Sequence, residues 1–331
     1  MEKRELRQDL VSGDWVLVST GRGNRPHQFK NKSKLKRAPK LRCSFENPKK
    51  AGGGVILLSL PNEKNWTLQV VPNKYPIVVH AKKGAVKKKR VGPFLTIPGI
   101  GHHELIITKD HDANFAKLKP KEATLVLMAF RERYNTLRKD TNLEYISNFH
   151  NWGPKAGASI YHPHYQILSI PVVPPDVAYS LDGSFKYFKE HKRCVHCTQI
   201  TWEKKQKKRI ITEDKNAIAF APFVSKEPFE MRVFLKKHSP FFEEASDEDL
   251  KSVAKVLQAS LRKLEKAVKN VNYNFFIHTA PIKERSKYKH YHWHIEIVPR
   301  LNISAGLELG TNIEVNSVDP DEAVRILRHA R

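Results

Sequence analysis

The stretch that decides the fold and the chemistry of this chain is Ala156-Gly157-Ala158-Ser159-Ile160-Tyr161-His162-Pro163-His164-Tyr165-Gln166-Ile167-Leu168. It begins with small residues, which allow a backbone to come close to a bulky anion. From His162 onward the stretch reads as a β-strand, and His162, His164 and Gln166 are then expected on one face. A neutral imidazole is a nucleophile at neutral pH, and a glutamine amide can donate to a phosphoryl oxygen. The pattern favours this chemistry over two histidines packed inside an ordinary sheet.

Length and composition set the class of protein. The chain has 331 residues, enough for two domains or one large one, and 40% of them are apolar and 28% charged, as in globular proteins. No apolar run approaches the length of a membrane span. The first residues lack the apolar core of a signal peptide. We therefore expect a cytoplasmic protein without a membrane partner.

The charge balance is strongly basic, with 59 Lys and Arg against 34 Asp and Glu, a formal net charge of +25. Such a balance attracts polyanions. Three interpretations remain open at this point: solvated surface charge, steering of small phosphorylated substrates, or binding of nucleic acid. The lysines are spread along the chain, which favours the first two over nucleic acid.

The chain reads as an internal duplication. His111 precedes His162 by 51 residues, and His238 precedes His292 by 54. Each half is expected to contain a strand that ends near the earlier histidine, a long helix, a strand and a His-x-His strand. These segments are 103–108, 120–138, 145–149 and the run from His162 in the first half, and 230–235, a helix from Ser246, 273–278 and 290–297 in the second. The pattern predicts an α+β fold of two repeated units, residues 1–170 and 171–331, each an antiparallel sheet crossed by one long helix.

Two sets of residues have the composition of metal sites. Three cysteines, with Cys194 and Cys197 in a Cys-x-x-Cys pair, argue against a disulfide framework in a cytoplasmic chain, and no βαβ pattern supports a redox motif. The duplication groups the candidate ligands as Cys43, Glu46, His111 and His162, and as Cys194, Cys197, His238 and His292. The second set is a normal structural zinc composition, whereas the first has a carboxylate in place of a thiolate. Free thiols beside surface histidines are the alternative for both.

Several motifs together resemble a known family. They are the segment from Glu5-Leu6-Arg7-Gln8-Asp9 to Gly21-Arg22-Gly23-Asn24-Arg25-Pro26, the run Pro72-Asn73-Lys74-Tyr75-Pro76, the stretch from Asn151 to Gln166, and Gly306-Leu307-Glu308-Leu309-Gly310. Over nearly its whole length the chain resembles galactose-1-phosphate uridylyltransferases and the related ADP-glucose phosphorylase-like proteins of the histidine-triad superfamily. The resemblance implies that both repeated units are histidine-triad-like.

The resemblance also implies a ping-pong transfer of UMP between hexose 1-phosphates. His164 would attack the α-phosphorus of a nucleotide sugar, a sugar 1-phosphate would leave, and a second one would take the nucleotide from the histidine. Gln166 would hydrogen-bond the phosphoryl oxygen, and His162 would be a metal ligand. The implied substrate-binding residues are Arg25, Asn73, Asn151, Gly157 and Ser159. The family further implies a homodimer.

Some residues depart from the family pattern. Glu46 stands where a second knuckle cysteine is expected, which affects the first metal set. Tyr165 stands beside the nucleophile where Gly or Ser is usual, which predicts a different sugar pocket. Tyr179 and Ser180 lie near the position of a glutamate that binds a second metal in some bacterial relatives, so we expect the Cys-pair zinc version of the second site.

Two alternative functions stay open from the sequence. An ADP-sugar or dinucleotide phosphorylase would use the same histidine with an adenine nucleotide and inorganic phosphate. A polyanion-binding protein without catalysis would account for the net charge, but it leaves the small-residue loop and Gln166 unexplained.

Overall fold

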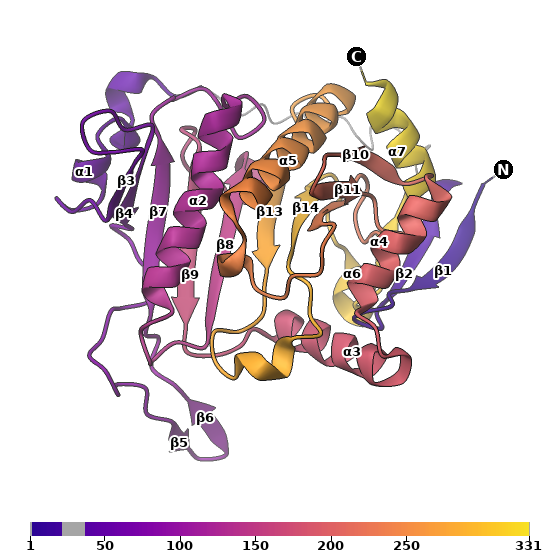
Figure 1. Ribbon diagram of the computed structural model, residues 1–331, viewed down its shortest axis with the longest axis horizontal. Helices are drawn as coiled ribbons and strands as arrows, with labels where there is room; N and C mark the ends of the chain where they lie inside the picture. The colour runs from indigo at the N-terminus through magenta and orange to yellow at the C-terminus, as the bar shows by residue number, and fades with distance from the viewer. Residues whose placement is uncertain (1, 22–36, 331) are drawn as a thin grey trace.

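The computed structural model describes residues 2–21 and 37–330. At its centre lies one antiparallel sheet with the strand order β10-β11-β12-β14-β13-β8-β9-β7-β4-β3 (Figure 1). The strands of the first half are β3 (Leu58–Leu60), β4 (Leu68–Pro72), β7 (His102–Thr108), β8 (Tyr145–Trp152) and β9 (His164–Ile170). Those of the second half are β10 (Ile210–Glu213), β11 (Ala217–Phe220), β12 (Met231–Leu235), β13 (Tyr273–His278) and β14 (His294–Pro299).

The two halves are joined edge to edge within this sheet. β8 of the first half pairs with β13 of the second, so that Asn151 lies opposite Asn274. The duplication extends to the strand register. Gln166 lies opposite Leu105 in the β7–β9 pair, and Glu296 lies opposite Arg232 in the β12–β14 pair. The predicted α+β fold of two repeated sheet-and-helix units is therefore confirmed.

The two long helices cover one face of the sheet (Figure 1). They are α2 (Pro120–Leu137) and α5 (Asp247–Ala267), close to the predicted ranges. Proline at the first position of α2 costs no hydrogen bond, because that N–H has no partner in a helix. At α5, Ser246 and Asp249 each accept a hydrogen bond from the other's backbone N–H, as in a capping box.

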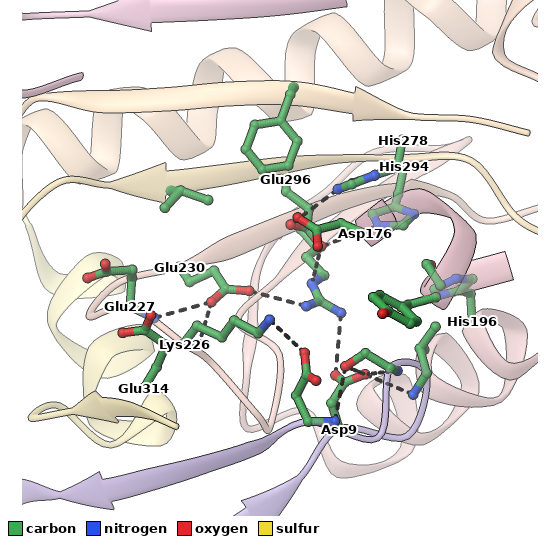
Figure 2. A pocket seen from close by; sticks show the side chains of 18 of the residues that line it. Asp9, Asp176, His196, Lys226, Glu227, Glu230, His278, His294, Glu296 and Glu314 are labelled. Carbon is green, nitrogen blue, oxygen red and sulfur yellow. Dashed lines mark hydrogen bonds and ion pairs between the residues drawn. The ribbon is translucent and has the colours of Figure 1, made fainter. Parts of the chain in front are cut away.

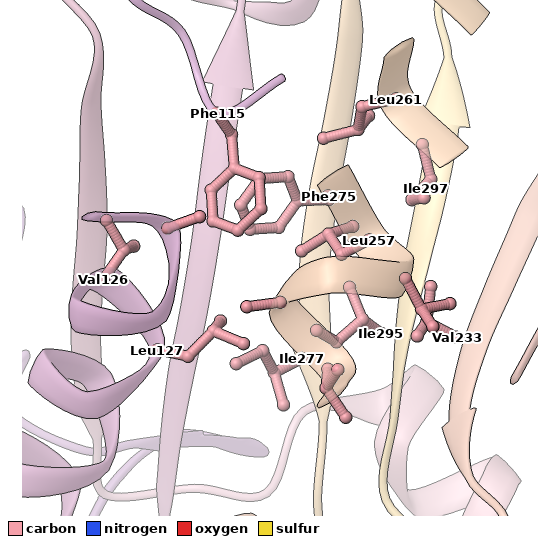
Figure 3. Packing of buried hydrophobic residues seen from close by; sticks show 14 of the residues in the cluster. Phe115, Val126, Leu127, Val233, Leu257, Leu261, Phe275, Ile277, Ile295 and Ile297 are labelled. Carbon is pink, nitrogen blue, oxygen red and sulfur yellow. The ribbon is translucent and has the colours of Figure 1, made fainter. Parts of the chain in front are cut away.

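A single hydrophobic core runs beneath both helices. It brings side chains of α2 and α5 together with inward-facing residues of strands from both halves, as Figure 3 shows for Leu127, Leu257 and Ile277. Burial of such side chains contributes roughly 1.5–3 kcal/mol each relative to exposure. The shared core makes the packing of one half dependent on the other.

The other elements flank the central sheet. Helices are α1 (Pro48–Ala51), α3 (Pro175–His191), α4 (Val195–Gln206), α6 (Gly306–Thr311) and α7 (Pro320–His329). Short 3₁₀ turns span Lys40–Arg42, Ser44–Glu46, Pro154–Ala156, Phe242–Glu244 and Arg285–Tyr288. β1 (Arg4–Gln8), β2 (Trp15–Ser19) and β15 (Glu314–Asn316) form a second sheet, and β5 (Lys89–Val91) and β6 (Phe94–Thr96) form a hairpin. No helix within the described ranges is long and apolar enough to cross a membrane.

The chain's first strands lie with its last ones. β2 pairs in parallel with β15, and Arg7 Nη2 lies 2.7 Å from Asp319 Oδ2. Residues 4–19 therefore pack beside the second repeated unit, although in sequence they belong to the first half of the chain (Figure 1). A largely buried ion pair between Arg7 and Asp319 thus connects the first strands to the last helix of the chain.

One expectation about the central stretch is wrong. The strand begins at His164, not at His162, and in the second half it begins at His294, not at His290. The reason in the first half is Pro163, which has no N–H to give to a strand ladder. His162 consequently points into a cluster of candidate metal ligands, while His164 points into a cleft.

Candidate active site and metal clusters

His164 has the protonation state of a nucleophile. Its Nδ1–H donates to the carbonyl oxygen of His162 at 3.0 Å, which leaves the lone pair on Nε2. The ring is 7% exposed, and burial lowers its pKa, so it is neutral at neutral pH. The Phe45 ring lies edge-on to it with centroids 5.0 Å apart. Packing and one backbone bond therefore fix the direction of the imidazole.

The cleft beside His164 has a volume of about 850 Å³, within the range of small-molecule sites. Of the predicted catalytic and substrate-binding residues, Asn73, Ser159, His164 and Gln166 line it, as do the predicted metal ligands Cys43 and Glu46. Among the described residues that line it, the basic side chains are Lys40, Arg42, Lys50 and Lys74, and the one acidic side chain is Glu46. A positive cleft attracts phosphorylated ligands.

His103 connects two of the cleft side chains, and the sequence motifs do not include it. Its Nε2 lies 2.9 Å from Gln166 Oε1. Asn73 Nδ2 lies 3.2–3.3 Å from both ring nitrogens. The signal that could have found it is the period of two along β7, because the face that carries Leu105 also carries His103.

The small-residue loop before His162 is held by the second half of the chain. Asn274 Nδ2 donates to Asn151 Oδ1 and to the Ala156 carbonyl oxygen, both at 2.8 Å. Gly157 has a φ of +86°, a region that favours glycine. Gly157 lies in this loop and Asn151 near the end of β8, and neither is among the residues that line the cleft. Neither Asn274 nor its role is apparent from the motifs.

Two predicted features have other outcomes. Arg25 lies outside the described residues. Tyr165 does not shape the sugar pocket as expected, because it is fully buried on the helix-covered face of the sheet. Its ring packs near Phe115, Phe130 and Phe275 in the core. A one-residue step along a strand turns a side chain to the opposite face, so a neighbour of the nucleophile cannot line the same cleft.

The first predicted metal set is brought together. The candidate ligand atoms of Cys43, Glu46, His111 and His162 all lie within 4.8 Å of one another. His162 Nε2–H donates to the Thr108 carbonyl oxygen at 2.6 Å and His111 Nε2–H to that of Ala38 at 2.8 Å. Both rings therefore present Nδ1 to the cluster, with the backbone support usual for metal-bound histidines. The donor set fits a four-coordinate metal with a carboxylate in the fourth position.

The second predicted set is also brought together, with its ligand atoms within 4.8 Å of one another. Cys197 Sγ lies 3.4 Å from His238 Nδ1 and 3.5 Å from His292 Nδ1. Hydrogen bonding from Cys197, and then from His238 and His292, holds the pKa of the Cys194 thiol below its usual range. Two thiols and two imidazoles are a common structural zinc set.

The second repeated unit has a cavity at the position that corresponds to the cleft (Figure 2). Its volume is about 300 Å³. Arg232 forms ion pairs there with Glu230 at 3.3 Å and Glu296 at 3.0 Å. The lining carries seven acidic side chains against three lysines and arginines. Among the described residues, acidic side chains therefore outnumber basic ones in this cavity, whereas basic side chains predominate in the cleft of the first unit.

Comparisons with known proteins identify the family of this chain. A family model described as "Domain of unknown function (DUF4921)" matches residues 81–329. ADP-glucose phosphorylase of Arabidopsis thaliana is 33% identical over 328 residues, which covers 98% of this chain and 92% of the relative. The chain belongs to the DUF4921 family, and this relative is similar to it over nearly its whole length. Galactose-1-phosphate uridylyltransferase of Thermotoga maritima is 29% identical over 334 residues, covering 98% of each.

Solved structures extend the family likeness to the fold. A crystal structure of an ADP-glucose phosphorylase from Arabidopsis thaliana with bound ADP-glucose has a TM-score of 0.84 and 30% identity, covering 99% of this chain and 100% of that one. The family members with these names transfer nucleotidyl groups, and this chain is a nucleotidyltransferase of the same family.

Proposed function

We propose that His164 carries a nucleotidyl group from a nucleotide sugar to an acceptor phosphate. The observation that supports this most directly is the neutral, buried imidazole whose Nδ1 is held by a backbone carbonyl while the ring lines a basic cleft. Gln166 beside it supplies an amide for the phosphoryl oxygens. The roles of Asn73, Asn151, Gly157, Ser159 and Arg25 in substrate binding belong to the same proposal.

The transfer takes place in two displacements. In the first, His164 Nε2 attacks the α-phosphorus, the N–P bond forms, and the bond from that phosphorus to the bridging oxygen breaks. The leaving group is a sugar 1-phosphate. In the second, an oxygen of the acceptor phosphate attacks the same phosphorus and the N–P bond breaks. Such transition states depend on positioning and charge neutralisation, which Gln166 and the lysines of the cleft would supply.

The leading form of this reaction is uridylyl transfer between UDP-glucose and a hexose 1-phosphate, a step of galactose metabolism. A second form is phosphorolysis of an ADP-sugar by inorganic phosphate. A specific observation favours that second form, because the ADP-glucose phosphorylase of Arabidopsis has the higher identity of the two relatives named above. Both forms use the same histidine and the same leaving group.

Zinc is the metal proposed for both clusters, since their donors are those that zinc binds. Zinc there would fix the strand ends around His162 and His292, and none of the bonds made or broken involves it. The homodimer, the cytoplasmic location and the division of the chain at residue 170 into a catalytic half and a zinc-knuckle half stay predictions.

The decisive experiment is to incubate the protein with UDP-glucose or ADP-glucose labelled in the α-phosphate and to trap an acid-labile adduct. We expect the adduct with the wild type and none with His164→Gly. Release of the label by hexose 1-phosphate or by inorganic phosphate identifies the acceptor. An adduct of equal amount on His164→Gly would contradict the proposed nucleophile.

A further inference from the structure

We propose that His103 is a positioning residue that sets the direction of the Gln166 side-chain amide. The inference rests on the proposed function and concerns how that function is prepared before substrate arrives. His103 is 8% exposed, so its ring occupies a defined place between the strand that carries it and the cleft. It acts on the reaction through Gln166 and has no part in the bonds made or broken.

The hydrogen bonds around His103 indicate which ring nitrogen carries the proton: Asn73 Nδ2 donates to Nδ1 at 3.3 Å, although it also lies 3.2 Å from Nε2. The backbone N–H of Ile77 points at Nδ1 at 3.4 Å, so Nδ1 is the acceptor and Nε2 carries the proton. Nε2–H then donates to Gln166 Oε1 at 2.9 Å. The reversed amide would place two donors against each other. Gln166 therefore has its oxygen occupied and its NH₂ group available for phosphoryl oxygens.

Asn73 contributes to the same arrangement. Its backbone N–H donates to the His103 carbonyl oxygen at 2.8 Å, and its Oδ1 accepts from the Tyr75 N–H at 2.9 Å. Its Nδ2 then lies against the imidazole. The ring is thereby confined between Asn73 and Gln166, and both cleft amides are aligned before a ligand binds.

The second repeated unit provides an internal comparison. His103 lies eight residues before His111, and Glu230 lies eight residues before His238. Glu296 takes the register position of Gln166, and Arg232 that of Leu105. An ion-paired triad thus replaces the His103–Gln166 hydrogen bond in the unit whose cavity is acidic. The His103–Gln166 pair occurs beside the proposed nucleophile, and its counterpart in the second unit is a set of charged side chains.

The direction of the amide matters because charge develops on the phosphoryl oxygens during transfer. An NH₂ group aimed at them stabilises that charge, whereas an amide oxygen in the same position repels it. Holding the amide in advance also removes the cost of reorienting it during the reaction. A loss of His103 should therefore lower the rate of nucleotidyl transfer to His164 more than it changes substrate binding.

The test is a double-mutant cycle on the single-turnover rate of adduct formation, with His103→Leu, Gln166→Ala and the double variant. We expect His103→Leu to slow the step about 10- to 100-fold, less than the roughly 10²- to 10³-fold cost of removing an oxyanion donor outright, with less than about a threefold change in KM. In the Gln166→Ala background, His103→Leu should change the rate less than about twofold, because its effect passes through Gln166. Equal effects in both backgrounds would overturn the proposal.

Two further variants separate positioning from folding. His103→Gln offers an N–H donor near the former Nε2 and should recover most of the lost rate. His102→Leu is the matched control, since His102 is the next residue on β7 and pairs with Asp140 at 3.0 Å. It should leave the rate near that of the wild type. A His103→Gln variant as slow as His103→Leu would contradict the proposed donor role.

A measurement without turnover keeps this inference distinct from the proposed function. In protein labelled with ¹⁵N-glutamine, the Gln166 NH₂ resonances are assigned with Gln166→Ala and compared between wild type and His103→Leu. We expect two sharp NH₂ signals at distinct chemical shifts in the wild type. In His103→Leu we expect signals averaged over several orientations of the Gln166 amide. Unchanged signals would overturn the positioning role, even if no nucleotide sugar forms an adduct. Failure of the function itself would appear as absence of adduct on the wild type.

Discussion

At the scale of single residues, His164 and His294 occupy equivalent positions in the two repeated units, but their surroundings differ. The two rings have the same local geometry, since His294 Nδ1–H donates to the His292 carbonyl oxygen at 3.1 Å. Burial lowers the pKa of His294 to about 4, so it too is neutral. However, its Nε2 lies 3.4 Å from Glu296 Oε1, and its ring stacks on Phe234 with centroids 4.8 Å apart. A carboxylate thus occupies the direction from which a phosphate would approach.

This difference predicts one nucleotidyl group per chain. We expect His294→Asn to form as much adduct as the wild type and His164→Asn to form none. Quantifying the bound nucleotide per chain by mass spectrometry of the intact protein measures both. Two groups per wild-type chain, or loss of adduct in His294→Asn with the fold intact, would show that the second cavity is a working site.

At the scale of elements, two helical segments each begin directly after a candidate metal ligand. The 3₁₀ turn Ser44–Glu46 follows Cys43, and α4 begins directly after Cys194. A metal ion bound by each cluster would cross-link these segments to β-strand ends and so stabilise them. Both clusters bring a ligand pair from the start of a helical segment against two histidines near strand ends.

Removing one ligand should therefore affect one element. We expect Cys197→Ser to lose one zinc per chain and to lower the Tm by about 5–10 °C, a loss of one to a few kcal/mol. Metal content by elemental analysis and calorimetry measure the two effects. Cys43→Ser is the matched comparison and should remove the other zinc. Unchanged zinc content in both variants would contradict the assignment of the clusters.

The loop that precedes His162 depends on an element of the other half. Asn274 on β13 bonds both Asn151 and Ala156, and Asn272 Oδ1 accepts from the Lys155 N–H at 3.0 Å. A Cβ at Gly153 would lie 2.2 Å from that Asn272 oxygen, which shows how closely the loop approaches. The shape of the proposed phosphate loop is thus set across the β8–β13 junction.

We expect Asn274→Ala to raise the KM for the nucleotide sugar about tenfold, the equivalent of one or two lost hydrogen bonds. The physical reason is a loosened loop at Ala156 and a free Asn151 amide. Steady-state kinetics measure the change, and Asn135→Ala on α2, whose amide donates to the Glu243 carbonyl oxygen instead, serves as a control. A KM equal to that of the wild type would mean that the loop keeps its shape without the clamp.

At the scale of the whole molecule, one neutral histidine, His150, is buried against aromatic residues of the core that both halves share. His150 is fully buried, and burial lowers its pKa to about 3. Its Nδ1–H donates to the His164 carbonyl oxygen at 2.7 Å, and its ring lies 4.5 Å from that of Tyr165. Protonation of this ring is compatible with the unfolded chain but strongly disfavoured in the fold.

The fold should therefore lose stability as the pH falls. The pKa of His150 is depressed in the folded state, so its contribution is fully present above the unfolded value near 6.5 and is lost as the pH falls toward about 3. At pH 5 the loss from one such histidine is about 2 kcal/mol. We expect urea unfolding of His150→Phe to show a pH 7 to pH 5 decrease smaller by that amount. Equal decreases in both proteins would contradict a neutral buried ring.

The sequence was sufficient for whatever depends on local period and spacing. The ranges of α2 and α5 follow from apolar residues on one helical face, and the capping pair at Ser246 fixes where α5 begins. The spacing of repeated histidines was enough to group the eight candidate metal ligands, because related positions in a duplicated unit occupy related places. His164 and Gln166 follow from the period of two along one strand.

Tertiary structure alone decided the contacts between segments distant in sequence. The His103–Gln166 bond, the Asn274 clamp and the ion pairs of Arg232 each join different strands, and strand order and register set them. The spacing of residues along the chain does not specify this register, because the register results from the packing of both helices on one sheet. The same reason explains Tyr165, whose direction depends on which face of β9 the core covers.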